Sequence, residues 1–139
     1  MPDTTLNLVP VVIAGVINMV IGALWYSPLV FGKLWMRTMG KTEEEFKQEL
    51  SLTKMAFTYV VNTIASLLFA YVLAHLIKFS QTHTFSQGVM IGFWVWLGFV
   101  VTTVIPGYMY ESKPKMLYFL FIIYQLISIT LIGGFLAIW

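Results

Sequence analysis

Charged residues are scarce in this chain of 139 residues, and cysteine is absent. Asp, Glu, Lys and Arg make up 10% of the residues, whereas a soluble domain carries about 25%. Without cysteine the chain forms no disulfide, thiolate nucleophile, iron–sulfur cluster or cysteine-ligated zinc site. Hydrophobic residues account for 59%, more than one soluble core of this size can bury. The composition argues against a soluble enzyme or nucleic-acid-binding protein and predicts an integral membrane protein.

Four stretches contain no charged residue and are long enough to cross a bilayer, which takes about 20 mostly apolar residues. They cover residues 8–26, 55–77, 85–105 and 116–139. Pro106 and Gly107 predict a break after the third stretch, and Pro114 predicts the start of the fourth. The chain is therefore expected to be an all-α membrane protein, a single domain of four transmembrane helices in a bundle.

Lysine and arginine are unequally distributed between the connections. The side opposite the termini carries Lys33, Arg37, Lys41, Lys47, Lys54, Lys113 and Lys115. The other side carries only Lys78. Because cytoplasmic loops are enriched in Lys and Arg, both termini are predicted to be extracytoplasmic.

The connection after the first span begins with residues too apolar to lie in water. We predict a short interfacial helix over 28–39 on the cytoplasmic side, where Lys33, Arg37 and Lys41 recur every four residues and form one basic stripe. Such a stripe suits anionic lipid headgroups, so membrane lipids are the expected partners. The alternative is a structured loop packed on the bundle.

A second helix is predicted in the same connection. Gly40 supplies a stop, and Thr42 followed by Glu45 forms a capping box. We expect this helix, over 43–54, to continue without a break into the second span.

Small residues at four-residue spacing mark helix contacts in the later spans. Gly88 and Gly92 share one face of the third span, and Gly133 and Ala137 share one face of the fourth. Small residues let helix backbones approach closely in lipid. The two spans are therefore predicted to meet at their outer ends.

Three amide side chains fall at similar depths within the spans. Asn18, Asn62 and Gln125 lie roughly 10–14 Å from the predicted cytoplasmic ends, at 1.5 Å per residue. They predict a hydrogen-bonded layer between helices, or the lining of a polar path. No Asp, Glu, Lys or Arg accompanies them in the spans.

Histidine and tryptophan supply few further candidates. His75 and His83 are too few to predict a metal site, and no cofactor is predicted. Trp94 and Trp96 are two residues apart, so they face nearly opposite sides of a helix. One is expected to pack in the bundle while the other meets lipid, a partner subunit or a bound ring system.

The end of the first span carries the most specific motif. Its residues are Gly22, Trp25, Tyr26, Ser27, Pro28, Phe31, Gly32 and Trp35. Pro28 prevents the helix from continuing, Ser27 can satisfy a terminal carbonyl, and the aromatic rings anchor at the interface. We call residues 25–32 the elbow and predict a fixed structural turn; the alternative is a gate over a vestibule formed with Tyr108, Tyr110 and Glu111.

This motif, with Gly98-Phe99 in the third span and the final helix ending at Trp139, resembles domain of unknown function family 1761 over nearly the whole chain. The resemblance implies a small bacterial protein with four spans, an inner-membrane location and no assigned activity. It carries no catalytic or binding residues to this chain.

Three functions follow from these patterns, in order of preference. The first is a non-enzymatic protein that works through helix packing, as a homo-oligomer or an accessory subunit of a membrane complex. The second is a channel or permease for a small neutral solute, or a lipid-handling protein. An enzyme comes last, because no activated acid, base or nucleophile stands out.

Overall fold

The computed structural model describes residues 5–139. All the regular secondary structure in that part is helical. Four helices are long and apolar enough to cross a membrane. They are α1 (Leu8–Trp25), α4 (Leu52–Phe79), the third span (Phe85–Tyr110) and α7 (Lys115–Ile138). Two short helices, α2 (Gly32–Thr38) and α3 (Glu43–Glu49), lie between the first two spans. The all-α, four-span prediction is confirmed, and the chain is a multi-pass membrane protein.

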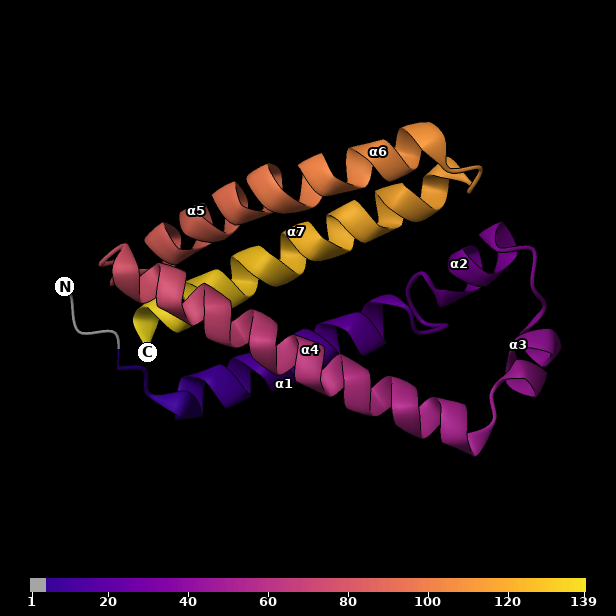
Figure 1. The fold of residues 1–139 in the computed structure, drawn as a ribbon, viewed down its shortest axis with the longest axis horizontal. Coiled ribbons are helices and arrows are strands. Elements are labelled where there is room, and N and C mark those ends of the chain that lie inside the picture. Colours follow the sequence, from indigo (N-terminus) through magenta and orange to yellow (C-terminus); the bar gives the residue numbers. More distant parts are fainter. Residues whose placement is uncertain (1–4) are drawn as a thin grey trace.

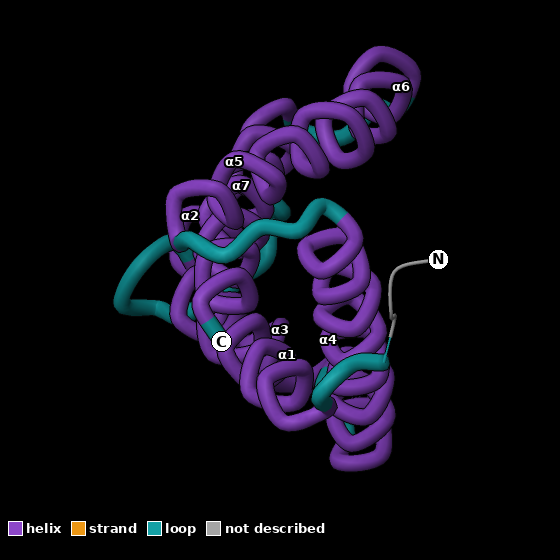
Figure 2. The backbone as a smooth tube through the Cα atoms, turned by 90° about the vertical axis from the view of Figure 1, so that its left-hand side faces the viewer, coloured by secondary structure: helices purple, strands orange, loops and turns teal. Residues whose placement is uncertain are grey.

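The spans form two helix pairs. α1 packs mainly on α4, and the third span packs mainly on α7. Figure 1 shows the start of α1 and the end of α7 at one end of the molecule, with α2 and α3 at the opposite end. Figure 2 views the spans end-on and shows α4 beside α1 and α5 beside α7. We call these two ends the terminal end and the elbow end.

The third span extends beyond its predicted boundary. It consists of α5 (Phe85–Val95), a π-helical segment η1 (Trp96–Val101) and α6 (Thr102–Tyr110), and Pro106 lies inside it. The predicted break at Pro106-Gly107 is therefore wrong. Thr102 Oγ1 donates to the Gly98 carbonyl at 2.6 Å, and Thr103 Oγ1 donates to Val100 at 3.0 Å. Threonine hydroxyls and local π turns compensate irregular hydrogen bonding in membrane helices, which is why a helix tolerates proline there.

The predicted continuous helix over 43–54 is also wrong, because it breaks at Leu50 and Ser51. Leu50 is extended, and the Ser51 side chain caps α4 by accepting a hydrogen bond from the Lys54 amide at 3.2 Å. Serine side chains compete with the helix for backbone donors in this way. The capping box at the start of α3 is present, since Thr42 and Glu45 bond each other's amides.

The interfacial helix is shorter than the predicted range of 28–39. It begins at Gly32, after a turn, and ends at Thr38, before Gly40 with its φ of +70°. Lys41 therefore lies beyond the helix and forms an ion pair with Glu49 of α3 at 2.6 Å. The basic stripe on α2 is reduced to Lys33 and Arg37, both exposed.

The best-packed region is the half of the bundle toward the terminal end. Its buried residues come from α1, α4 and α7, and include Val11, Ala14, Ala70, Leu73, Ile77, Ile129 and Ile132. The third span adds the glycine face of α5. A Cβ atom at Gly92 would lie 2.7 Å from the Ile129 carbonyl oxygen, and one at Gly133 would lie 2.5 Å from that of Gly88. Ala137 is buried beside them, so these four residues form one backbone-to-backbone contact between α5 and α7.

Candidate functional site

The three predicted amides do not meet in one layer. The Asn18 amide donates to Ser66 Oγ at 2.8 Å and accepts from Ser128 Oγ at 2.5 Å. This cluster joins α1, α4 and α7, and both serines are buried. Asn62 is exposed and Gln125 is half-buried, and neither side chain has a hydrogen-bond partner within residues 5–139.

The geometry of the helix pairs explains why Asn62 does not join the cluster around Asn18. It lies one helical turn from Ser66, on the same face of α4. In Figure 1, α4 diverges from α1 toward the elbow end. Ser66 still reaches α1 through its bond with Asn18, whereas Asn62, one turn nearer the start of α4, is exposed. Sequence depth alone could not show this divergence. In the sequence, Ser66 is one of several small residues on one face of the second span, and no pattern distinguishes Ser128.

The elbow is a compact turn held by its own backbone. Ser27 Oγ donates to the Leu24 carbonyl at 2.7 Å, which satisfies one of the last acceptors of α1. The amides of Val30 and Gly32 both donate to the Ser27 carbonyl, at 3.1 and 2.8 Å. A Cβ atom at Gly32 would lie 2.6 Å from the Ser27 carbonyl carbon. Glycine is needed here because the turn approaches its own backbone so closely.

Aromatic rings join the elbow to three helices. Tyr26 lies 5.7 Å from Tyr124 of α7 and 6.2 Å from Trp35 of α2, between ring centroids. Trp35 in turn lies 5.7 Å from Phe46 of α3. Trp25 stacks on Phe31 at 4.5 Å, and its buried indole N–H finds no acceptor within residues 5–139. Hydrogen bonds therefore shape the turn itself, and ring packing positions it against the helices.

A cavity of about 790 Å³ lies between the elbow and α4. We call it the α4-side cavity. Its walls come from the elbow, α2, α3 and the start of α4, and its lining residues are Tyr26, Pro28, Gly32, Trp35, Met36, Glu43, Phe46, Lys47, Leu50, Met55, Thr58, Tyr59 and Asn62. Most of these side chains are apolar or aromatic, while charged groups come only from α3.

A second cavity of about 450 Å³ lies on the other side of the elbow, against α6 and α7. Tyr26 and Trp35 line both cavities and form the wall between them. Glu111 lines this α7-side cavity, whereas Tyr108 and Tyr110, predicted beside it in a vestibule, are not among its lining residues.

An ionic cluster lies at the mouth of the α7-side cavity. Glu111 accepts hydrogen bonds from Lys113 at 2.8 Å and from the Tyr118 hydroxyl at 2.9 Å. The hydrogen bond from Lys113, followed by that from Tyr118, lowers the pKa of Glu111. The same bond to Glu111 raises the pKa of Lys113. Both shifts favour the charged forms, and the bond from Tyr118 links the turn between α6 and α7 to the first turns of α7.

The whole bundle, including the elbow, matches a known family. The family described as protein of unknown function (DUF1761) matches residues 9–137. The chain belongs to the DUF1761 family. No curated protein and no solved structure matches it. Membership agrees with the resemblance noted from the elbow motif, and it assigns no activity.

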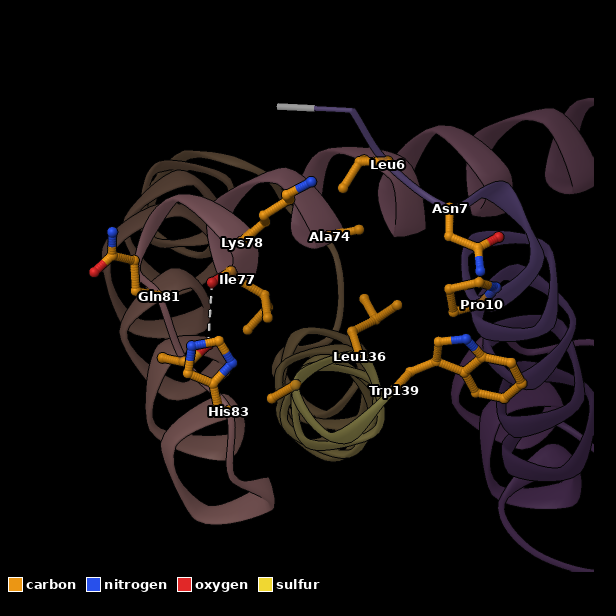
Figure 3. Close-up of a pocket in the computed structure, with 12 residues that line it drawn as sticks. Leu6, Asn7, Pro10, Ala74, Ile77, Lys78, Gln81, His83, Leu136 and Trp139 are labelled. Atoms are coloured by element: carbon orange, nitrogen blue, oxygen red, sulfur yellow. Dashed lines mark hydrogen bonds between the residues drawn. The ribbon is translucent and has the colours of Figure 1, made fainter. Parts of the chain in front are cut away.

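A third cavity of this DUF1761 protein lies at the terminal end and measures about 610 Å³. Figure 3 shows Lys78, Gln81 and His83 on one side of it and Asn7 and Trp139 on the other. The Lys78 ammonium donates to the Thr5 carbonyl, so it already has a hydrogen-bond partner within the chain. The cavity joins the start of α1 to the turn after α4.

The remaining candidates have mainly structural contacts. Trp96 packs against the core, and its indole N–H donates to the Ile122 carbonyl at 2.9 Å, whereas Trp94 is 59% exposed. The two tryptophans therefore face different surroundings, as their spacing indicated. His75 lies over Tyr71, 4.4 Å between ring centroids. Within residues 5–139, no cluster of three His, Cys, Asp or Glu side chains is placed to hold a metal ion.

Proposed function

We propose that this DUF1761 protein is a non-enzymatic lipid-handling protein that holds a phospholipid in the α4-side cavity. The lipid-handling function was one of the alternatives that the sequence left open. The observation that carries it is the gradient of polarity along this cavity, from charged side chains on α3 to an apolar and aromatic wall.

The lining of the α4-side cavity changes with depth. Glu43 and Lys47 lie on α3, outside the spans, whereas the lining residues from Met55 to Asn62 belong to α4, which is a span. Asn62 lies ten residues after the first residue of α4, about 15 Å along the helix axis. A phospholipid likewise joins a charged headgroup to long hydrocarbon chains. The volume of about 790 Å³ lies within the range of ligand pockets, about 300–1,000 Å³.

The exposed amide of Asn62 needs a partner from outside the described chain. A polar group in the hydrocarbon region loses its hydrogen bonds to water and is costly unless another group bonds it. The ester carbonyl of a lipid held in the cavity is the acceptor that we propose for it. A helix of a second copy is the competing partner, and it is distinguished by the experiment below.

The glycine faces and the Asn18 amide, which suggested a packing function, find their contacts within one chain. Gly88, Gly92 and Gly133 are covered by the α5–α7 contact, and the Asn18 amide is bonded on both sides. They explain how a single copy folds and do not call for a partner helix. These bonds occupy Asn18, and neither Asn62 nor Gln125 bonds to it, so the three amides do not form one row along a path within residues 5–139. Self-association and membership in a larger complex stay predictions from the sequence.

The test is native mass spectrometry of the protein released from mild detergent, comparing two matched variants. Thr58→Trp places a large ring in the α4-side cavity, whereas Thr53→Trp places the same ring on α4 at an exposed position that does not line it. We expect wild type and Thr53→Trp to retain phospholipid and Thr58→Trp to lose most of it. Lipid-free wild type, or a lipid-free dimer that Thr58→Trp dissociates, would refute the proposal.

We also propose that the elbow end faces the cytoplasm, so that the α4-side cavity opens to the inner leaflet. The support is the excess of Lys and Arg in the two connections at this end. Reporter fusions after Trp139 and within the turn after Glu111 test it. Activity of a cytoplasmic reporter at Trp139 would reverse the orientation.

A further inference from the structure

We propose that the α4-side cavity selects a net-neutral phospholipid headgroup that carries both a phosphate and an ammonium group. This inference rests on the proposed function and names the lipid class. It follows from the charges at the mouth of the cavity, their separation and the absence of an excess of either sign.

The charged residues that line the cavity are one acid and one base. Glu43 and Lys47 lie four residues apart on α3, and their charged atoms are 3.1 Å from each other. An anionic headgroup would gain from Lys47 and be repelled by Glu43. A zwitterionic headgroup places its phosphate at Lys47 and its ammonium at Glu43, so both contacts are favourable.

The pair is free to exchange partners. The side chains of Glu43 and Lys47 are 61% and 71% exposed, and such ion pairs contribute little to stability. Opening the pair to admit a headgroup therefore costs little. Two contacts with the lipid then replace one contact within the protein.

The other charged residues at this end do not line the cavity, so they do not add to the charge of its lining. Lys41 and Glu49 already pair with each other at 2.6 Å, and neither lines the cavity. Glu45 is used in the capping box of α3. Lys33 and Arg37 lie on the exposed surface of α2 and do not line the cavity. The predicted attraction for anionic lipid therefore belongs to α2 and the surrounding bilayer, not to the cavity.

The side chains deeper in the cavity suit the rest of such a lipid. The Asn62 amide offers donors to the ester carbonyls, and the rings of Trp35, Phe46 and Tyr59 offer an apolar wall to the glycerol and the first methylene groups. None of these groups distinguishes one headgroup from another. Headgroup selection is therefore assigned to Glu43 and Lys47 alone.

The test uses vesicles with equal amounts of phosphatidylethanolamine, phosphatidylcholine and phosphatidylglycerol, followed by native mass spectrometry of the protein extracted from them. We expect the two zwitterionic lipids to be retained over phosphatidylglycerol by about fivefold, the ratio that corresponds to a contact of roughly 1 kcal/mol. Glu43→Lys makes the mouth purely basic and is expected to reverse the preference toward phosphatidylglycerol.

Glu44→Lys is the matched control. It changes the net charge by the same amount on the same first turn of α3, at an exposed residue that does not line the cavity. We expect it to keep the wild-type preference. Enrichment of phosphatidylglycerol by wild type, or equal responses of the two variants, would overturn the headgroup assignment while leaving a lipid-binding cavity. Wild type without any lipid would instead overturn the proposed function.

Discussion

The two ends of the bundle are built by different means. At the terminal end, glycine and alanine bring α5 and α7 into backbone contact, and buried aliphatic residues of α1, α4 and α7 fill the centre. At the elbow end the helix pairs diverge, and large aromatic rings and two short helices occupy the space between them. Small residues bring the helix backbones together at the terminal end, whereas large rings link the helices at the elbow end and line the two cavities beside the elbow.

This comparison predicts that the terminal end contributes most to stability and that the elbow end contains the proposed lipid site. The cavities beside the elbow are lined by side chains whose contacts are mostly ring against ring, and these tolerate adjustment. The glycine contacts at the terminal end do not tolerate adjustment, because backbone atoms cannot move aside as side chains do. The following predictions test that division, from the largest expected effect to the smallest.

The largest effect is expected for Gly88→Ala at the terminal end. The new methyl group would collide with the backbone of Gly133 and with the Ala137 side chain, forcing α5 away from α7. Overpacking of this kind costs about 1–3 kcal/mol, and we expect the upper part of that range. Thermal unfolding in detergent measures it. Gly98→Ala is the control, because a Cβ atom there meets nothing within 4 Å; equal losses would contradict the prediction.

Asn18→Leu is expected to cost somewhat less, about 1–2 kcal/mol. It removes two hydrogen bonds between helices and leaves the buried hydroxyls of Ser66 and Ser128 without their partner. Asn62→Leu serves as the comparison, since that amide has no bond within residues 5–139 to lose. We expect it to reduce lipid retention without lowering the unfolding temperature. If both variants were destabilised alike, the distinction between Asn18 and Asn62 would fail.

Gly32→Ala is expected to loosen the elbow at a cost of about 1 kcal/mol, with little effect elsewhere. The added methyl group would press on the backbone of Ser27 and open the turn. Hydrogen–deuterium exchange should rise in peptides covering residues 26–39 and stay unchanged in α5. A rise spread evenly over the chain would show that the two ends are not independent.

The smallest effect is expected from the Glu111 cluster at the exposed turn between α6 and α7. The pKa of Glu111 is lowered in the folded state by the hydrogen bonds from Lys113 and Tyr118. Its contribution is therefore fully present above the ordinary pKa of glutamate and is lost as the pH falls through the lowered value. We expect amide protection around residues 111–118, corrected for intrinsic exchange, to fall over that interval.

Glu111→Gln should remove this pH dependence and leave a uniformly weaker turn. Glu44→Gln is the control, because Glu44 is exposed on α3, far along the chain from this turn. A pH dependence that persists in Glu111→Gln would assign it to another group.

Local patterns in the sequence predicted most of the secondary structure. Long uncharged stretches mark the spans because backbone polar groups in lipid must bond within a helix, and this depends on composition alone. The capping box of Thr42 and Glu45 and the turn at Gly40 depend on neighbours within a few residues. For the same reason, the glycine spacing pointed to the correct faces of α5 and α7.

Where the patterns failed, competing local signals were of similar strength. Pro106 is a strong breaker in water, but threonine hydroxyls and the π turn of η1 compensate it in this span. Ser51 is a modest signal, yet its side chain caps α4 and ends the helix that was expected to run from α3. Hydropathy does not resolve such choices.

By itself, the sequence determined four membrane spans, an uneven distribution of charge and a turn after the first span, because these depend on residues close together in the chain. The tertiary structure alone decided which side chains meet. The crossing of α1 and α4 brings Asn18 to Ser66 and, one turn further, separates the helices and leaves Asn62 at a cavity. Crossing angles are set by packing over the whole bundle, so they cannot be predicted from any single segment.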